Sequence, residues 1–211
     1  MCHGISWWKE TAVYEEEDNF FDPPMEVENP ILETTAEVVA KAEAIAKRAM
    51  KGFRKGSKRP AWEHPADVVA LVKRVPGVRP NLGTQNYLEA LAWLHDVLED
   101  TEVTEEDLRN EGIPEHVILG VKALTREEWM TTNFYYRNLD RSFELVKIVK
   151  VCDRIANLTE GKPLLPRSWW MKYTGETKHF VAPLTFEMGE PWRAWLLEQL
   201  KLAASGPDSQ Y

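Results

Sequence analysis

Apolar residues recur at intervals of three and four through most of this chain, which is the spacing of one face of an α-helix. The first such run begins near Thr34 and continues through Val38, Ala42 and Ile45. Further runs occupy residues 64–76, 85–99, 114–124, 139–158, 168–181 and 189–204. None of them alternates apolar and polar residues as a half-buried strand does. The sequence therefore predicts an all-α fold.

The two ends of the chain lack this pattern. Residues 1–33 contain a run of four acidic residues at 15–18 and several prolines, which predicts an irregular acidic N-terminal extension. We expect residues 34–204 to form one domain and residues 205–211 to be a disordered tail. With 211 residues, the chain can bury a large core and needs no disulfides for stability.

Composition excludes several classes of protein. The only cysteines are Cys2 and Cys152, too few for a disulfide framework or a cysteine-based zinc site. No apolar run is long enough to span a membrane, and the first residues do not have the order of a secretory signal. A net charge of −8 argues against nucleic acid as a partner. We therefore expect a cytoplasmic protein that acts on a small molecule; the oligomeric state is not predicted.

One stretch departs from the acidic character of the chain. Residues 47–59 contain seven cations and no acid. They are Lys47, Arg48, Lys51, Arg54, Lys55, Lys58 and Arg59. Two interpretations are open: a site for a small polyanion such as a nucleotide, or a solvated helix end followed by a loop.

The segment 95–101 reads HDVLEDT and follows a strongly apolar helical run. On a continuous helix, His95 lies above Glu99, and Asp96 lies above Asp100. Burying so many polar groups together is costly unless they have partners. A divalent metal ion bound by the imidazole and the carboxylate removes that cost, so the segment is a candidate metal site.

Two further segments carry isolated polar residues in apolar surroundings. The run 149–158 reads VKVCDRIANL and places Asp153 and Asn157 on one helix face. Asp153 is either a metal ligand or one half of a salt bridge between helices, with Arg54 or Arg154 as its partner. His64 precedes Pro65 at the expected start of a helix. It is a second candidate ligand, or alternatively a helix cap or surface residue.

Together these segments resemble the HD superfamily, in which a His, a later His-Asp pair and a distant Asp occur in this order. The strings R-K-x(8)-H-P, H-D-V-L-E-D-T-x-V-T and V-K-V-C-D-R-I-A-N-L resemble more specifically the hydrolase domain of the RelA/SpoT alarmone family and the small alarmone hydrolases. The resemblance covers roughly residues 36–182. It implies an HD-type helical bundle. Met50, where many members have a histidine, and residues 126–140, which do not align, depart from the family pattern.

The resemblance also implies roles for individual residues. The ligands of one metal ion, typically Mn²⁺ or another divalent transition metal, are His64, His95, Asp96 and Asp153. The catalytic acids are Glu99 and Asp100. The residues that contact the nucleotide are Arg54, Lys55 and Asn157.

By this resemblance, the expected activity is hydrolysis of the 3′-pyrophosphate of (p)ppGpp, giving GDP or GTP and pyrophosphate. The length leaves no room for an alarmone synthetase domain, so only hydrolysis is expected. Two alternatives stay open. One is an HD phosphohydrolase acting on another nucleotide, such as a deoxynucleotide or NADPH. The other is a nucleotide-binding protein without catalytic activity.

Overall fold

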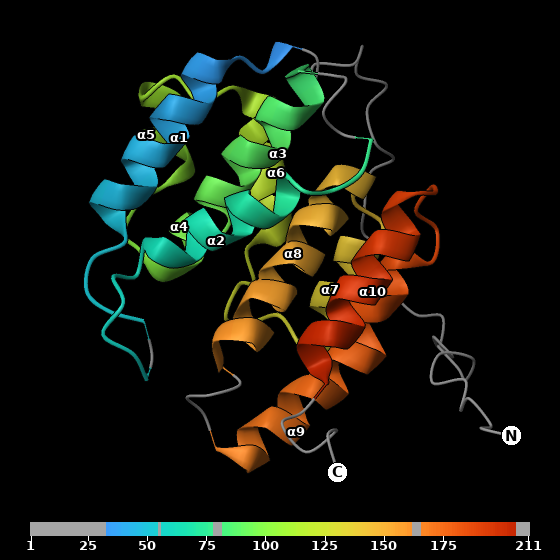
Figure 1. Cartoon of the computed structure of the whole chain (residues 1–211). Coiled ribbons are helices and arrows are strands. Elements are labelled where there is room, and N and C mark those ends of the chain that lie inside the picture. Colours follow the sequence, from blue (N-terminus) through green and yellow to red (C-terminus); the bar gives the residue numbers. More distant parts are fainter. Residues whose placement is uncertain (1–32, 55, 78–81, 162–165, 206–211) are drawn as a thin grey trace, which may run out of the picture.

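The computed structural model describes residues 33–54, 56–77, 82–161 and 166–205 (Figure 1). The α-helices in these ranges are α1 (Ala36–Ala49), α2 (Glu63–Val72), α3 (Leu82–Leu94), α4 (Val97–Asp100), α5 (Glu105–Asn110), α6 (Glu115–Leu124), α7 (Thr132–Asp140), α8 (Glu144–Gly161), α9 (Arg167–Glu176) and α10 (Trp192–Ala204). A π-helical turn, Thr177–Val181, and a 3₁₀ turn, Ala182–Thr185, follow α9. No strand occurs in the described ranges. The predicted all-α fold is confirmed, whereas nearly all of the predicted extension and tail lies outside these ranges.

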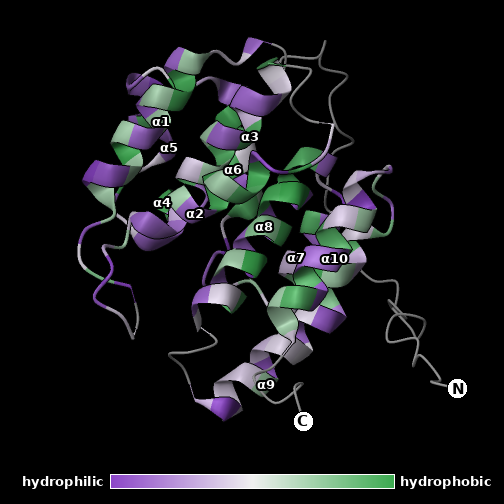
Figure 2. Ribbon diagram, in the orientation of Figure 1, coloured by the Kyte–Doolittle hydropathy of each residue, from purple (hydrophilic) through white to green (hydrophobic). Residues whose placement is uncertain are grey.

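Helix α8 occupies the middle of the molecule and packs against α2, α3, α6, α7 and α10 (Figure 1). Its Ile148, Val149 and Val151 side chains are fully buried. Figure 2 colours much of α8 as apolar, as expected for a helix covered on several sides. The predicted helix at 139–158 is confirmed in type, and its observed bounds are a few residues later. A polar residue on α8 is therefore buried unless it faces a cavity or a partner.

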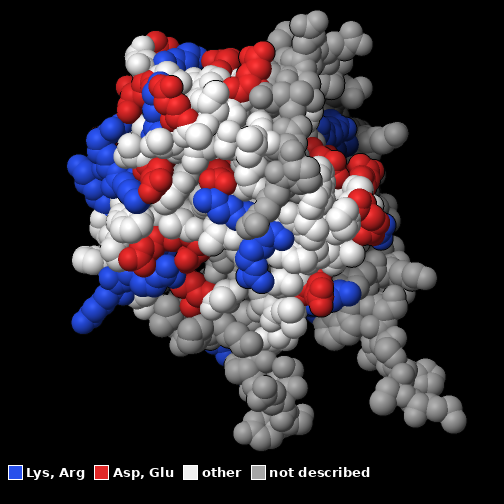
Figure 3. All heavy atoms as spheres, turned by 45° about the horizontal axis from the view of Figure 1, so that its top comes forward, with Lys and Arg blue, Asp and Glu red and all other residues white. Residues whose placement is uncertain are grey.

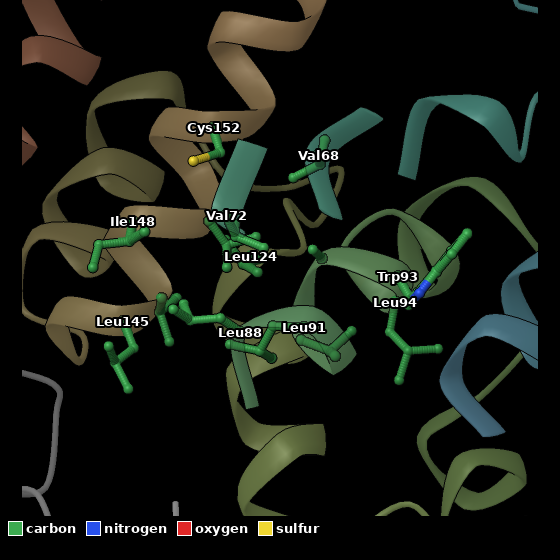
Figure 4. Close-up of a cluster of buried hydrophobic side chains, with 14 of the residues drawn as sticks. Val68, Val72, Leu88, Leu91, Trp93, Leu94, Leu124, Leu145, Ile148 and Cys152 are labelled. Carbon is green, nitrogen blue, oxygen red and sulfur yellow. The ribbon is translucent and has the colours of Figure 1, made fainter. Parts of the chain in front are cut away.

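The main core lies where α2, α3, α6 and α8 meet, as the close-up in Figure 4 shows. Val72 from α2, Leu88 and Leu91 from α3, and Ile148 from α8 are completely buried. Truncating a leucine of this kind to alanine costs about 2–5 kcal/mol. The core therefore fixes α2, α3 and α8 relative to one another, and these are the helices that carry or border the predicted ligands.

Helix α6 approaches α3 closely at Gly120. A Cβ atom at this position would lie 2.6 Å from the side chain of Leu91 and 2.7 Å from the hydroxyl of Tyr87. Both distances are shorter than a carbon atom tolerates, so a larger residue would require either these two side chains or the helices themselves to shift. The absence of a side chain at Gly120 thus permits the tight packing of these two helices.

Two helices begin with a threonine cap. Thr104 and Asp107 form a capping box at the start of α5, as their spacing in the sequence favours. At α1 the cap is Thr35, whose hydroxyl accepts a hydrogen bond from the Val38 N–H at 3.4 Å. Thr34, near which the first helical run was expected to begin, forms a hydrogen bond with the His116 Nε2 atom at 2.8 Å through its hydroxyl. Thr34 therefore ties the start of α1 to α6.

The predicted helix at 85–99 is interrupted at its functional segment. Helix α3 ends at Leu94 and α4 begins at Val97, so His95 and Asp96 form a turn between them. The His95 Nδ1 atom lies 2.8 Å from the carbonyl oxygen of Ala92. This local bond from side chain to backbone competes with continued helix. The helix is therefore broken at His95. Asp96 still precedes Asp100 by one helical turn, because the Asp100 N–H donates to the Asp96 carbonyl oxygen at 2.8 Å.

The segment that does not align with the family contains a helix of its own. Helix α7 begins after Thr131, whose hydroxyl accepts a hydrogen bond from the Phe134 N–H at 3.2 Å. Tyr135 and Tyr136 lie on its buried face against α8 and the following turns. Trp129, which precedes α7 in the sequence, is largely exposed and contacts the ring of Phe134.

On the face drawn in Figure 3, lysines and arginines are interspersed with acids, and no extended basic surface appears there. Within the described ranges, no helix is both long enough and apolar enough to cross a membrane.

Candidate metal centre and nucleotide site

The four predicted ligands come from three places in the fold and converge on one point. His64 is the second residue of α2, His95 and Asp96 form the turn after α3, and Asp153 lies in the middle of α8. Helix α2 begins at Glu63, so Pro65 is its third residue and not the first as predicted. No hydrogen bond is lost there, because the N–H groups of a first helical turn have no partner within the helix.

The distances between these side chains are short. His64 Nε2 lies 3.0 Å from Asp153 Oδ1 and 3.7 Å from Asp96 Oδ2. His95 Nε2 lies 3.0 Å from Asp96 Oδ2 and 3.7 Å from Asp153 Oδ1. Each imidazole therefore faces both carboxylates.

Three of the four residues are close enough together to bind one metal ion. The ligand atoms of His64, His95 and Asp96 all lie within 4.8 Å of one another. Asp153 falls outside that group but contacts both imidazoles. His95 Nε2 is buried and makes no well-directed hydrogen bond to the described residues, although it points at carboxylate oxygens. Such an atom suits a divalent cation between the rings and the carboxylates.

The electrostatics of the cluster also call for positive charge. Burial disfavours a charged His95, but the carboxylates of Asp96 and Asp153 outweigh this effect and raise its pKa to about 10. Burial also opposes ionisation of Asp153, yet Lys150 and the two imidazoles hold the pKa of this carboxyl well below its usual range. Two buried carboxylates thus stay ionised beside the imidazoles, and a cation would be stabilised between them.

Lys150 is a member of this site that the sequence interpretation missed. Its Nζ atom lies 3.0 Å from Asp153 Oδ2 and 5.6 Å from the ring centroid of Tyr135. Only 16% of its side chain is exposed. Burial disfavours its charge, but Asp153 outweighs burial and raises the pKa of Lys150 well above its usual value. Its position three residues before Asp153 was the available signal, because that spacing places both on one helix face.

Asp153 does form an ion pair, but its partner is neither Arg54 nor Arg154, the two arginines named as alternatives. Arg154 donates to the Tyr136 hydroxyl at 2.8 Å, and its guanidinium lies 3.8 Å from the ring centroid of Tyr173. Arg54 pairs with Glu160. The ion-pair partner of Asp153 is Lys150. His64 is likewise neither a helix cap nor a surface residue, since it is 1% exposed.

The predicted catalytic acids lie on α4, which directly follows the turn formed by His95 and Asp96. Glu99 Oε2 accepts a hydrogen bond from the backbone N–H of Arg126 at 2.9 Å. Partial burial raises the pKa of Glu99, and the negative charges of Asp96 and Asp100 add to this effect. Partial burial together with Asp96 raises the pKa of Asp100 as well. Carboxyls with raised pKa values are suited to proton transfer near neutral pH.

The contact between Arg126 and Glu99 was not predicted. It involves a backbone group of a segment that does not align with the family, so no side-chain pattern could have revealed it.

Two of the three predicted nucleotide contacts lie beside the cluster. Arg54 Nη2 donates to Asn157 Oδ1 at 2.6 Å, and Asn157 Nδ2 donates to Asp153 Oδ1 at 2.5 Å. A continuous chain of hydrogen bonds therefore joins Arg54 to the ligand cluster. The third residue, Lys55, lies outside the described residues.

Most described cations of the basic run already have acidic partners. Lys47 pairs with Glu43, Arg48 with Glu111, and Arg54 with Glu160, while Arg59 contacts Glu63 and Asp67. Lys51 and Lys58 are exposed. The run is therefore not a continuous unpaired cationic surface. Among the described cations of this run, Arg54 is the one that is joined to the cluster by hydrogen bonds.

Comparisons with known proteins agree with this geometry. A probable guanosine-3′,5′-bis(diphosphate) 3′-pyrophosphohydrolase of Synechocystis sp. is 31% identical over 196 residues, covering 87% of this chain and 25% of that protein. The guanosine-3′,5′-bis(diphosphate) 3′-pyrophosphohydrolase of Haemophilus influenzae is 29% identical over 172 residues, covering 77% of this chain and 24% of its own length. The chain thus spans about a quarter of the length of these relatives.

A solved structure shares the fold. It is that of a metazoan ortholog of SpoT, described as hydrolysing ppGpp and playing a role in starvation responses. It matches with a TM-score of 0.62 and 19% identity, covering 80% of this chain and 96% of the other. No family model matches the chain. The helical fold, the converging His and Asp side chains and these relatives together support an HD-superfamily protein similar to the RelA/SpoT hydrolases.

Proposed function

We propose that this chain is a metal-dependent phosphohydrolase that removes the 3′-pyrophosphate of (p)ppGpp, giving GDP or GTP and pyrophosphate. One observation carries the proposal. A buried cluster of two histidines and two aspartates adjoins two acids with raised pKa values, in a chain that aligns over most of its length with a named 3′-pyrophosphohydrolase.

In this proposal His64, His95, Asp96 and Asp153 hold one divalent ion, and Mn²⁺ is the ion we propose. Imidazole nitrogen together with carboxylate oxygen suits divalent transition metals. When bound, such an ion would lower the pKa of a water molecule and neutralise negative charge on the phosphoryl group. Lys150 keeps Asp153 ionised and fixes its second oxygen, so that Oδ1 faces the imidazoles.

Glu99 and Asp100 carry the proton transfers. One carboxylate accepts a proton from the attacking water, whose oxygen forms a bond to the phosphorus attached to the ribose 3′ oxygen, while the bond between that phosphorus and the 3′ oxygen breaks and pyrophosphate is released. The other carboxyl donates a proton to the departing 3′ oxygen, or it orients the first carboxyl and the proton comes from water. The Arg126 N–H fixes one oxygen of Glu99, which restricts the directions in which that carboxyl can reach. The division of these two roles between Glu99 and Asp100 is open to experiment.

Arg54, Lys55 and Asn157 bind the nucleotide in this scheme. The guanidinium of Arg54 matches the geometry of a phosphate, and the Asn157 amide suits a ribose hydroxyl. Arg54 lies within two hydrogen bonds of Asp153, so phosphate bound by Arg54 is held next to the ligand cluster.

Product analysis tests the proposal. Purified protein with Mn²⁺ is incubated separately with ppGpp, NADPH and a panel of deoxynucleotides, and all products are separated by chromatography. We expect GDP and pyrophosphate from ppGpp. Phosphate from a different nucleotide alone would retain the metal chemistry and change the substrate. Nucleotide binding without any product would support a non-catalytic binding protein.

A further inference from the structure

The face of α8 that carries Asp153 and Asn157 continues to a third polar residue. Glu160 follows Asn157 by three positions, so the three side chains form one stripe along the helix. Its side chain is only 11% exposed. Neither the metal cluster nor the proton transfers described above use this buried acid.

Glu160 contacts Arg54 directly. Arg54 Nε donates to Glu160 Oε2 at 3.0 Å, while Arg54 Nη2 donates to Asn157 Oδ1 at 2.6 Å. The two acceptors belong to adjacent turns of α8, so the guanidinium lies along the helix between them. The third nitrogen of the guanidinium, Nη1, takes part in neither of these two bonds.

The other oxygen of Glu160 faces a second arginine of the same loop. Glu160 Oε1 lies 3.6 Å from Arg59 Nη1. Arg59 is held in turn by Glu63 at 2.9 Å and Asp67 at 2.8 Å, both on α2. Arg59 therefore fastens the loop to α2, and Glu160 connects that loop to α8.

We propose that Glu160 is a positioning residue that holds Arg54 in the orientation in which it binds the nucleotide. The inference rests on the proposed function. A long arginine side chain loses conformational freedom when it binds phosphate, and a side chain held in place beforehand loses less. An arginine braced by a carboxylate on one edge and an amide oxygen on the other presents its remaining N–H groups in a fixed direction. If the carboxylate instead competes with phosphate for Arg54, its removal lowers KM rather than raising it.

The test compares KM and kcat for ppGpp in wild type, Glu160→Gln and Glu160→Ala. We expect KM to rise by about 3- to 10-fold in Glu160→Ala, the factor that corresponds to ordering one long side chain. Glu160→Gln retains a neutral acceptor, so a smaller rise is expected; this variant also guards against misfolding of the alanine variant. Values of kcat and Mn²⁺ affinity should stay unchanged, because Glu160 does not contact the ligand cluster. An unchanged or lower KM overturns the proposal.

A matched control and a double variant separate positioning from a general structural role. Glu111→Gln removes the acidic partner of Arg48, an exposed residue of α1 that contacts neither Arg54 nor Glu160, and should leave KM unchanged. On an Arg54→Lys background, Glu160→Gln should have no further effect, because the residue it positions is already altered. Additive effects would overturn the proposal.

Failure of the proposed function gives a different pattern. Wild type then turns over no ppGpp, and the same variants are compared by calorimetric binding of GDP. Weaker GDP binding in Glu160→Ala than in wild type would support positioning without hydrolysis. Equal binding in both, or no GDP binding by wild type, would overturn the inference as well.

Discussion

The two ends of the candidate site are built in different ways. At the metal end, His64, His95 and Asp153 are almost completely buried, and every charge faces an opposite charge within the protein. At the nucleotide end, the Arg54 side chain is partly exposed and braced by Glu160 and Asn157. The metal end is thus fixed by the packing of α2, α3 and α8. The nucleotide end depends on a loop secured by hydrogen bonds, so mutations at the two ends should have separable effects.

The largest effect is expected from removing one ligand of the metal end. Asp96→Ala should abolish turnover, because the ion loses a ligand and water is no longer activated. The protein should stay folded, as judged by circular dichroism, because the Asp96 side chain is at the edge of the cluster and 20% exposed. Asp107→Ala is the control: it removes an exposed acid from the capping box of α5, a helix that carries none of the four ligands, and should leave turnover intact. Turnover by Asp96→Ala would contradict the assigned site.

Substitution of the two proposed catalytic acids, Glu99 and Asp100, should reduce the rate of hydrolysis without reducing metal binding. Glu99→Gln and Asp100→Asn keep the shapes of the side chains and remove their charges. We expect kcat to fall by about 10²- to 10⁴-fold in at least one of them, the usual contribution of a positioned acid or base. Mn²⁺ affinity should stay close to that of wild type. Loss of metal binding in Glu99→Gln would instead make that carboxylate part of the metal end.

Substitution of Lys150 tests whether the metal end depends on the buried ion pair between Lys150 and Asp153. In Lys150→Met, Asp153 loses its buried cation, and the free energy of unfolding should fall by about 3 kcal/mol in metal-free protein. Added Mn²⁺ should reduce this deficit, because a bound cation restores positive charge beside Asp153.

Lys147→Met is the matched control on the same helix. Its buried side chain pairs at 3.5 Å with Asp140, which is 43% exposed and stays solvated when the lysine is removed. Denaturant titrations of both variants, with and without Mn²⁺, give the comparison. An equal loss of stability in the two variants would show that the pairing with Asp153 has no special role.

A smaller effect concerns pH. Burial and neighbouring acids raise the pKa values of Glu99 and Asp100, so the folded protein binds their protons more tightly than the unfolded chain does. Their ionisation therefore costs stability as pH rises through the interval between the unfolded and folded pKa values. Asp100→Asn should therefore raise the free energy of unfolding by a small amount at pH values above that interval. At pH values below the interval it should have no such effect.

Denaturant titrations of metal-free wild type and Asp100→Asn over a pH series check this statement. An equal dependence of stability on pH in the two proteins would contradict the raised pKa of Asp100.

The sequence predicted the fold class, because the helical spacing of apolar residues is a short-range pattern. The convergence of His64, His95, Asp96 and Asp153 was predicted from the resemblance to the HD superfamily, since the residues alone left other interpretations open for His64 and Asp153. The break between α3 and α4 was not predicted, since the bond from His95 to the Ala92 carbonyl depends on a side-chain conformation. Contacts between segments distant in sequence, such as Arg54 with Glu160 or Arg126 with Glu99, depend on tertiary packing and were missed for that reason.

The most direct test of the account is the stoichiometry of Mn²⁺ binding, measured by calorimetry on wild type, Asp153→Asn and Glu99→Gln. The account predicts one ion per chain in wild type and in Glu99→Gln, with binding weakened by about 100-fold or lost in Asp153→Asn. No binding by wild type, or unchanged binding by Asp153→Asn, would contradict a metal centre built from His64, His95, Asp96 and Asp153.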